Sequence, residues 1–302
     1  MGEIAGCPGW YCGRKILENG ELSECGACPR GFRRNDSFIC IPCNDNPTFY
    51  DWLYLGFIVL FLLILHLFFI DMVSMRRSFS KNGLILHCTA IIEVTVSSIF
   101  SLLLIRPFGS LEIKSCAVRS ITDWYTLLHN PSPNYEGTVH CTQEAVYPLY
   151  TIVFLFYILN LLFMLIFRSW LCWKILPRQS KMSIYAAMYY LPILGITHAI
   201  VGGLLYYVFP YLIVILSVIS CAVHFAFSIN QTVFSHIMTT LVSPRNMVIL
   251  FGHWCLHAYG ITSITEFKEP LFHSLLILLV PLPTLFYIFT ARFTNPKKFD
   301  KS

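Results

Sequence analysis

Six of the twelve cysteines lie within the first 43 residues, in a spacing that allows two kinds of chemistry. They are Cys7, Cys12, Cys25, Cys28, Cys40 and Cys43. Two C-x-x-C pairs have the ligand spacing of a tetrahedral zinc site, but a zinc ion would leave Cys7 and Cys12 unused. Disulfides would use all six, and so short a segment needs cross-links because it buries little apolar core. We therefore expect disulfides in this cysteine-rich head, with zinc as the alternative.

Two further cysteines, Cys116 and Cys141, lie in the loop 106–147, which is far longer than the median connection of about 4–6 residues. We expect them to form a disulfide within that loop, because an oxidising compartment favours an even number of paired cysteines. Asn35 begins an Asn-Asp-Ser sequon and is the candidate for glycosylation.

Three ionisable residues, Glu93, His253 and His257, fall inside apolar segments, where such side chains are functional candidates. His253 and His257 are four residues apart and share a helical face, so with a third ligand they could hold zinc and activate water. We favour packing instead, with neutral histidines bonded to neighbouring helices and Glu93 protonated or paired inside a bundle. The sequence therefore predicts no catalytic residue, no metal and no cofactor, and a zinc hydrolase remains an alternative.

The overall composition indicates the class of protein in which these side chains are held. Only 12% of residues are charged, about half of the ~25% in soluble domains, and the mean hydropathy is +0.64. A soluble enzyme could not cover its core with so few charges, so the chain is predicted to be an all-α polytopic membrane protein. The net charge of +5 is too small and scattered to indicate nucleic-acid binding.

Spanning helices of about 20 apolar residues can be placed seven times along the chain. The predicted spans are Leu53–Ile70, Leu84–Ile105, Leu149–Phe167, Ser183–Val208, Tyr211–Phe227, Met247–Ile264 and Leu271–Ala291. The fourth and fifth come from one uncharged run that we divide at Pro210, because proline kinks or ends a helix. The segment Val233–Val242 is too short to cross and is expected at the membrane interface.

Lysine and arginine in short loops set the orientation of a membrane protein. With the head outside the cytosol, twelve such residues fall in cytosolic segments and four in the opposite loops. The eight cysteines of the head and loop then face the oxidising side. Residues 1–20 lack the apolar stretch of a cleavable signal peptide, so the first span is expected to act as the anchor. The expected organisation is a lumenal head over residues 1–52, a transmembrane region over 53–291 that includes the lumenal loop 106–147, and a cytosolic tail over 292–302.

Many short stretches make the chain similar to the Jun-kinase-associated membrane protein family, in order and over nearly its whole length. They are Trp10–Gly13, Cys25–Gly31, Tyr50–Phe57, Asp123–Thr126, Asn130–Pro133, Val139–Thr142, Glu144–Thr151, Gly202–Tyr211, His253–Ile261 and Phe286–Phe293. The chain departs from the family mainly in residues 72–83, 168–182 and 228–246, which are cytosolic in the expected topology.

The resemblance implies a seven-span protein of the endoplasmic-reticulum membrane that helps to dispose of misfolded proteins. It implies three partners besides the lipid bilayer, namely a membrane-bound RING ubiquitin ligase, the proteasome and a stress-activated kinase, and it carries over no catalytic residue. We therefore expect a non-enzymatic adaptor, and a transporter or receptor with a lumenal ligand is the second alternative. Candidate cytosolic contacts are Arg76, Arg77, Lys174, Arg178, Lys297 and Lys298, each of which also suits lipid headgroups.

Overall fold

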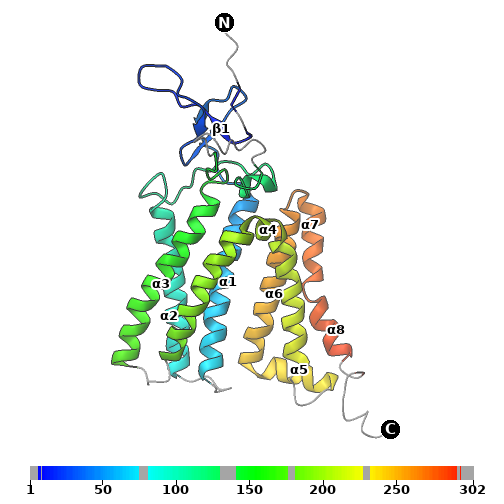
Figure 1. The fold of residues 1–302 in the computed structure, drawn as a ribbon. Helices are drawn as coiled ribbons and strands as arrows, with labels where there is room; N and C mark the ends of the chain where they lie inside the picture. The colour runs from blue at the N-terminus through cyan, green and yellow to red at the C-terminus, as the bar shows by residue number, and fades with distance from the viewer. Residues whose placement is uncertain are drawn as a thin grey trace. The chain divides into compact units, whose positions relative to one another are not determined.

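The computed structural model describes residues 6–7, 9–74, 81–129, 141–175, 181–226, 232–290 and 293. The chain divides into two structural units, residues 1–206 and 207–302. The first holds β1 (Cys12–Gly13), β2 (Gly26–Ala27), β3 (Phe32–Arg34), β4 (Cys40–Pro42), α1 (Phe49–Ser74), α2 (Lys81–Leu103), the short helix η1 (Ile121–Trp124), α3 (Leu149–Lys174) and the start of α4 (Met182–Ala226) (Figure 1). The second holds the rest of α4, then α5 (Val233–Val242), α6 (Pro244–Thr265), α7 (Pro270–Leu276), η3 (Ile277–Leu279) and α8 (Leu282–Thr290).

The head contains two small antiparallel sheets, which lie over the ends of α1, α2 and α3 (Figure 1). In the first, β1 pairs with β2 and Cys12 faces Ala27. In the second, β3 pairs with β4 and Arg33 faces Ile41. Two-stranded sheets are marginally stable alone, so this part of the chain depends on its cross-links.

Four disulfides supply those cross-links, and all six head cysteines take part in them. The head cysteines are therefore used for disulfides, as the sequence indicated, and not for a zinc site. The pairs are Cys7–Cys25, Cys12–Cys141, Cys28–Cys40 and Cys43–Cys116. Gly13 lies directly against the third bridge, where an added Cβ would meet each of its two sulfur atoms at 2.8 Å.

The expected bridge between Cys116 and Cys141 is wrong, because each of these loop cysteines bonds to a head cysteine instead. The backbone explains part of the difference. Ser115 N–H donates to the Asp45 carbonyl at 2.8 Å, and this pairing brings the neighbouring Cys116 to Cys43. Residues 1–52 and 106–147 are therefore covalently joined twice, and the predicted boundary at residue 52 divides segments that are cross-linked to each other.

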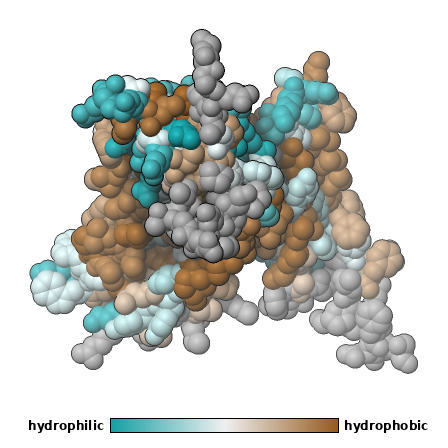
Figure 2. All heavy atoms as spheres, turned by 45° about the horizontal axis from the view of Figure 1, so that its top comes forward, coloured by the Kyte–Doolittle hydropathy of each residue, from teal (hydrophilic) through white to brown (hydrophobic). Residues whose placement is uncertain are grey.

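Among the residues that the structure describes, six helical segments are long and apolar enough to cross a membrane. They are Phe49–Met72, Lys81–Leu103, Leu149–Lys174, Met182–Ala226, Asn246–Thr265 and Pro270–Thr290. Figure 2 shows hydrophobic side chains, in brown, over these helices and hydrophilic ones, in teal, gathered at the head. Phe68, Ile158 and Ile200 are more than half exposed, as side chains that face lipid must be.

Seven spans are not confirmed. The predicted break at Pro210 falls inside α4, which is helical over 45 residues, about twice the ~20 that one crossing needs. A helix can continue through proline with a kink when neighbouring groups satisfy the freed carbonyl. The last span is interrupted instead, because α7, η3 and α8 follow one another around Pro281 and Pro283. The expected interfacial segment is a separate short helix with the predicted bounds, α5.

Two helix boundaries affect the functional argument. At the start of α1, Asp51 accepts from Thr48 N–H at 2.8 Å while Thr48 Oγ1 accepts from Asp51 N–H at 3.2 Å, which is a reciprocal cap. At the other boundary, α3 continues seven residues beyond the predicted end, to Lys174, and this places Arg168 within the helix.

Candidate functional site

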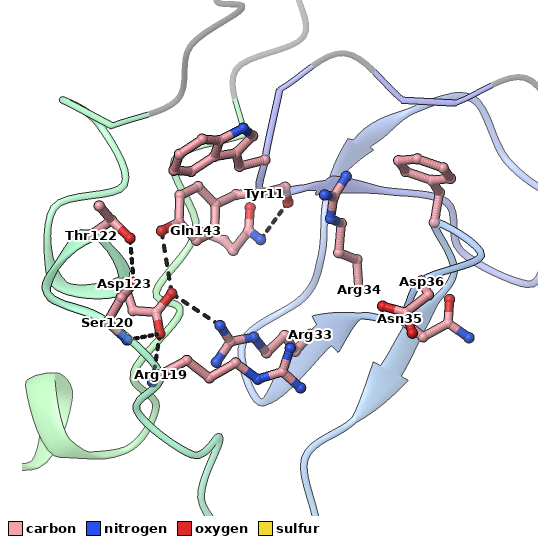
Figure 3. Close-up of a pocket in the computed structure, with 12 residues that line it drawn as sticks. Tyr11, Arg33, Arg34, Asn35, Asp36, Arg119, Ser120, Thr122, Asp123 and Gln143 are labelled. Atoms are coloured by element: carbon pink, nitrogen blue, oxygen red, sulfur yellow. Dashed lines mark hydrogen bonds and ion pairs between the residues drawn. The ribbon is translucent and has the colours of Figure 1, made fainter.

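A pocket of about 480 Å³ lies where the head meets the loop 106–147. Its walls come from Trp10 and Tyr11 ahead of β1, from β3 and the turn after it, and from the segment 119–123, which includes most of η1 (Figure 3). Segments so distant in sequence meet here because the disulfides of Cys12 and Cys43 join the head to the loop. The pocket is within the 300–1,000 Å³ range of small-ligand sites.

Asp123 organises the inner wall of the pocket and is 3% exposed. One carboxylate oxygen accepts from the Tyr11 hydroxyl at 3.2 Å and from an Arg33 guanidinium nitrogen at 3.0 Å. The other accepts from the backbone N–H groups of Arg119 at 2.9 Å and Ser120 at 3.2 Å. Burial raises the pKa of the Tyr11 phenol, so this group keeps its proton and donates. The carboxylate is thereby fully used in holding the wall together.

Three arginines line the pocket, and their guanidinium groups differ in how many hydrogen bonds and ion pairs they make within the protein. Arg33 is neutralised by Asp123 and also donates to the Ala117 carbonyl at 2.7 Å. Arg34 lies over the Phe38 ring, 4.8 Å from its centroid, and burial lowers the pKa of its guanidinium. Arg119 is exposed, and its guanidinium has no partner among the described residues. Two cationic groups are therefore not matched by a direct ion pair.

Two amide side chains complete the rim. Gln143 donates to the Tyr11 carbonyl, while its Oε1 atom is buried with no hydrogen-bond partner in the described part of the chain. Asn35 lies at the edge of the same pocket, where its Oδ1 accepts from the N–H groups of Ser37 and Ile39 at 3.0 and 2.9 Å. Glycosylation of Asn35, a sequence prediction, would place a sugar at this rim.

A second polar cluster lies within the helices of the first unit, and Glu93 is at its centre. Arg168 from α3 binds the Glu93 carboxylate of α2 through two nitrogens, with Nε–Oε1 at 3.3 Å and Nη2–Oε2 at 2.5 Å. Both residues are 0% exposed. Glu93 was expected to be either protonated or paired inside the bundle, and it is paired with Arg168. Arg168 was counted among the cytosolic charges, and its burial reduces that count from twelve to eleven.

The ion pair is surrounded by neutral partners from two more helices. His66 of α1 lies 2.8 Å from Asn160 Oδ1 through Nε2 and 2.6 Å from the Tyr190 hydroxyl through Nδ1. The carbonyl-type oxygen of Asn160 can only accept, so Nε2 carries the proton and Nδ1 accepts from Tyr190. Arg168 also approaches Nδ1 at 3.3 Å. The cluster joins α1, α2, α3 and α4, and the sequence signal for it was the placement of His66, Glu93 and Asn160 inside the first three spans.

The histidines of α6 do not assemble a metal site. His257 Nδ1 lies 2.8 Å from the Ser217 hydroxyl of α4, and the His253 ring centroid is 6.1 Å from that of His224. Within the described ranges, no three His, Cys, Asp or Glu side chains come together as metal ligands. Since the Glu93 carboxylate is held by Arg168, it is not a free base for the zinc-hydrolase alternative.

Of the six candidate cytosolic contacts, only Lys174 is described. It ends α3 as an exposed residue, and its ammonium lies 4.4 Å from the ring centroid of Trp173, which is 75% exposed. Arg76, Arg77, Arg178, Lys297 and Lys298 lie outside the described residues.

Comparison with known proteins adds evidence that covers almost the entire chain. A family profile described as "JNK1/MAPK8-associated membrane protein" matches residues 7–296. The chain is 48% identical over 301 residues to the mouse protein of that name, which covers 97% of this chain and 94% of the relative. For the human protein the identity is 47% over 300 residues, with the same coverage. A homolog from Caenorhabditis elegans is 28% identical over 302 residues, covering 95% of this chain and 93% of the relative. None of the solved structures matches.

Proposed function

Because the chain belongs to the JNK1/MAPK8-associated membrane protein family, we propose that it is a non-enzymatic adaptor of the endoplasmic-reticulum membrane. In this role it couples a membrane-bound RING ubiquitin ligase and the proteasome to misfolded clients and modulates stress-kinase signalling. The observation that carries the proposal is the family match over residues 7–296, since the relatives are named for association with JNK1/MAPK8. The ligase and proteasome contacts are the expectation drawn from the sequence resemblance.

The disulfides support a lumenal head. All eight cysteines of the head and loop are paired, whereas the four free cysteines lie in α2, α3, α4 and α6. Such a division fits an oxidising compartment on the side of the head. The eleven basic residues that remain in the opposite segments, against four in the head-side loops, favour the same orientation. We therefore place the N-terminus in the lumen and the C-terminus in the cytosol, with seven spans if α4 crosses twice.

The cytosolic surface then consists of short basic segments. The structure describes part of one of them, at the end of α3, where Lys174 lies over Trp173. Confinement of partners to one bilayer raises their effective concentration, so weak contacts suffice for coupling. The partner contacts proposed are Arg76, Arg77, Lys174, Arg178, Lys297 and Lys298.

The test is recovery of partners with the intact protein. We expect the tagged full-length chain, isolated in a mild detergent from cells that accumulate misfolded proteins, to bring down JNK, a RING ligase and proteasome subunits. Charge reversal of Arg76, Arg77, Lys174 and Arg178 should reduce recovery, whereas Lys15→Glu, an exposed reversal on the head, should not. Recovery of none of the three partners with intact protein would contradict the adaptor role.

Orientation needs a separate measurement. In sealed microsomes, a protease added from the cytosolic side should remove a C-terminal tag and leave the disulfide-linked head intact. Digestion of the head under these conditions would place the basic segments in the lumen and remove the proposed docking surface.

A further inference from the structure

The pocket between the head and the loop holds polar groups that the protein's own contacts leave unused. The Arg119 guanidinium has no partner among the described residues, and Arg34 contacts the Gly9 carbonyl at 3.2 Å and the Phe38 ring and interacts with the charge of Asp36 without a direct ion pair. The buried Gln143 Oε1 atom is an acceptor without a donor. Because an unsatisfied buried acceptor is costly, a donor that enters the pocket would be favoured there.

The charge of the lining favours an anion. Three arginines face two aspartates, and Asp123 already receives four donors from the wall itself. That leaves Arg34 and Arg119 against the single exposed carboxylate of Asp36. Guanidinium groups pair with carboxylates in a planar, two-bond geometry, so carboxylates suit this wall.

The shape of the site favours an extended ligand over a compact ion. A second cavity of about 170 Å³ is lined by Arg33, Arg34 and Arg119 as well, and shares Asn35 and Asp36 with the first. Figure 3 shows these three arginines reaching into the space between the head strands and the loop. The two cavities therefore border one arginine-lined wall.

Apolar surface is present beside the charges. Trp10 is 56% exposed on the pocket wall and Phe38 forms part of the same lining. An aromatic ring that remains so exposed next to cationic groups offers a surface for an apolar side chain.

We propose that this pocket binds an extended acidic peptide segment, with its carboxylates on Arg119 and Arg34, a backbone N–H on Gln143 Oε1 and an apolar side chain on Trp10. A neutral sugar would leave the arginines unpaired, and an isolated inorganic anion offers neither an N–H donor for Gln143 nor an apolar group for Trp10. The proposal goes beyond the adaptor role and does not depend on it, since it concerns the purified protein alone.

The test uses the full-length protein in detergent with its disulfides intact. The probe is a fluorescein-labelled peptide of alternating glutamate and leucine, and its control has glutamine in place of glutamate. We expect saturable binding of the glutamate peptide, about tenfold tighter than that of the control, and weakening as ionic strength rises. Arg119→Glu should weaken binding about tenfold or more, whereas the matched reversal Lys15→Glu outside the pocket should change it less than about twofold.

Arg119 suits this test because its side chain has no described contact that folding would lose, and Trp10→Ala provides a second variant on the exposed aromatic surface. Absence of saturable binding, or equal binding by Arg119→Glu and the unaltered protein, would overturn the proposal. So would inorganic phosphate or a sialylated oligosaccharide that displaces the probe as effectively as unlabelled glutamate peptide, because either result would assign the site to another ligand class.

Discussion

The head–loop region and the helical bundle of the first unit both join segments that are far apart in sequence, but they do so with different chemistry. Cys12 and Cys141, 129 residues apart, are joined by a covalent bond. Glu93 and Arg168, 75 residues apart, are joined by an ion pair that is 0% exposed. A disulfide constrains the unfolded chain, whereas a buried ion pair depends on the presence of both partners. The two regions should therefore respond differently to the loss of one member of a pair.

The largest loss of stability is expected when one member of the buried ion pair in the helical bundle is removed. Arg168→Leu leaves Glu93 without its partner, and we expect a loss of about 3–5 kcal/mol in the free energy of unfolding. Glu93→Leu combined with Arg168→Leu should recover most of that loss, because the uncompensated charge is gone. Thermal unfolding of the four proteins in the same detergent measures the coupling. A double variant less stable than Arg168→Leu would contradict this account.

The disulfide that joins head and loop should give a loss of similar or smaller size. We expect Cys12→Ser to lower stability by about 2–5 kcal/mol. Cys141→Ser should have the same effect, and the double variant should be no worse than either. The measurement is thermal unfolding with and without reductant, together with peptide mapping under non-reducing conditions. A map that links Cys116 to Cys141 would refute the pairing described here.

Close packing between the two regions gives a smaller effect. A Cβ atom at Gly203 of α4 would meet the Trp124 Cβ atom at 2.5 Å and the Tyr125 ring at 2.7 Å. Gly203→Ala should therefore destabilise by about 1–3 kcal/mol. Gly195→Ala on the same helix is the control, since nothing lies within 4 Å of its added Cβ. It should leave stability unchanged or raise it slightly, because alanine favours helix. Equal effects of the two substitutions would argue against the contact of η1 with α4.

The smallest effect concerns pH. Glu144 accepts from the Thr151 N–H group at 2.9 Å and pairs with Arg30 at 3.4 Å, yet burial raises its pKa above the ordinary value. A raised pKa in the folded state means that Glu144 contributes stability below the ordinary pKa of glutamate. That contribution is lost as the pH rises through the raised value. Melting temperature across this window should fall less in Glu144→Gln than in the unaltered protein, and parallel curves would count against the assignment.

The sequence was informative about the apolar helices and about the presence of disulfides. Hydropathy over windows of helix length located the apolar helices, and Val233–Val242 was predicted with its observed bounds. Six cysteines in a segment too small for a core indicated disulfides. Which cysteine bonds to which could not be predicted, because the spacing of six or eight cysteines fits many pairings. Cys116 and Cys141 looked like a loop pair, but each bonds to a head cysteine, and the approach of residue 45 to residue 115 accounts for Cys116.

Arg168 illustrates the same limit inside the helices. It stands near other basic residues at the end of an apolar run, which is the local pattern of a cytosolic loop charge. Its role depends on Glu93, which lies on another helix. The signal that could have found it was the placement of His66, Glu93 and Asn160 in three successive spans. The pocket between the head and the loop gave no local signal, because Arg33, Arg119 and Gln143 come from segments far apart in sequence.

The ion pair also has a consequence for how the chain is made. A ribosome delivers about 5–20 residues each second, so Arg168 follows Glu93 by about 4–15 s. Throughout that interval the growing chain contains Glu93 without the guanidinium that pairs with it. The contact between α2 and α3 at this ion pair can therefore form only after Arg168 has been added to the chain. This fixes the order of assembly and leaves a period in which an incomplete chain exposes an unmatched acid to the membrane.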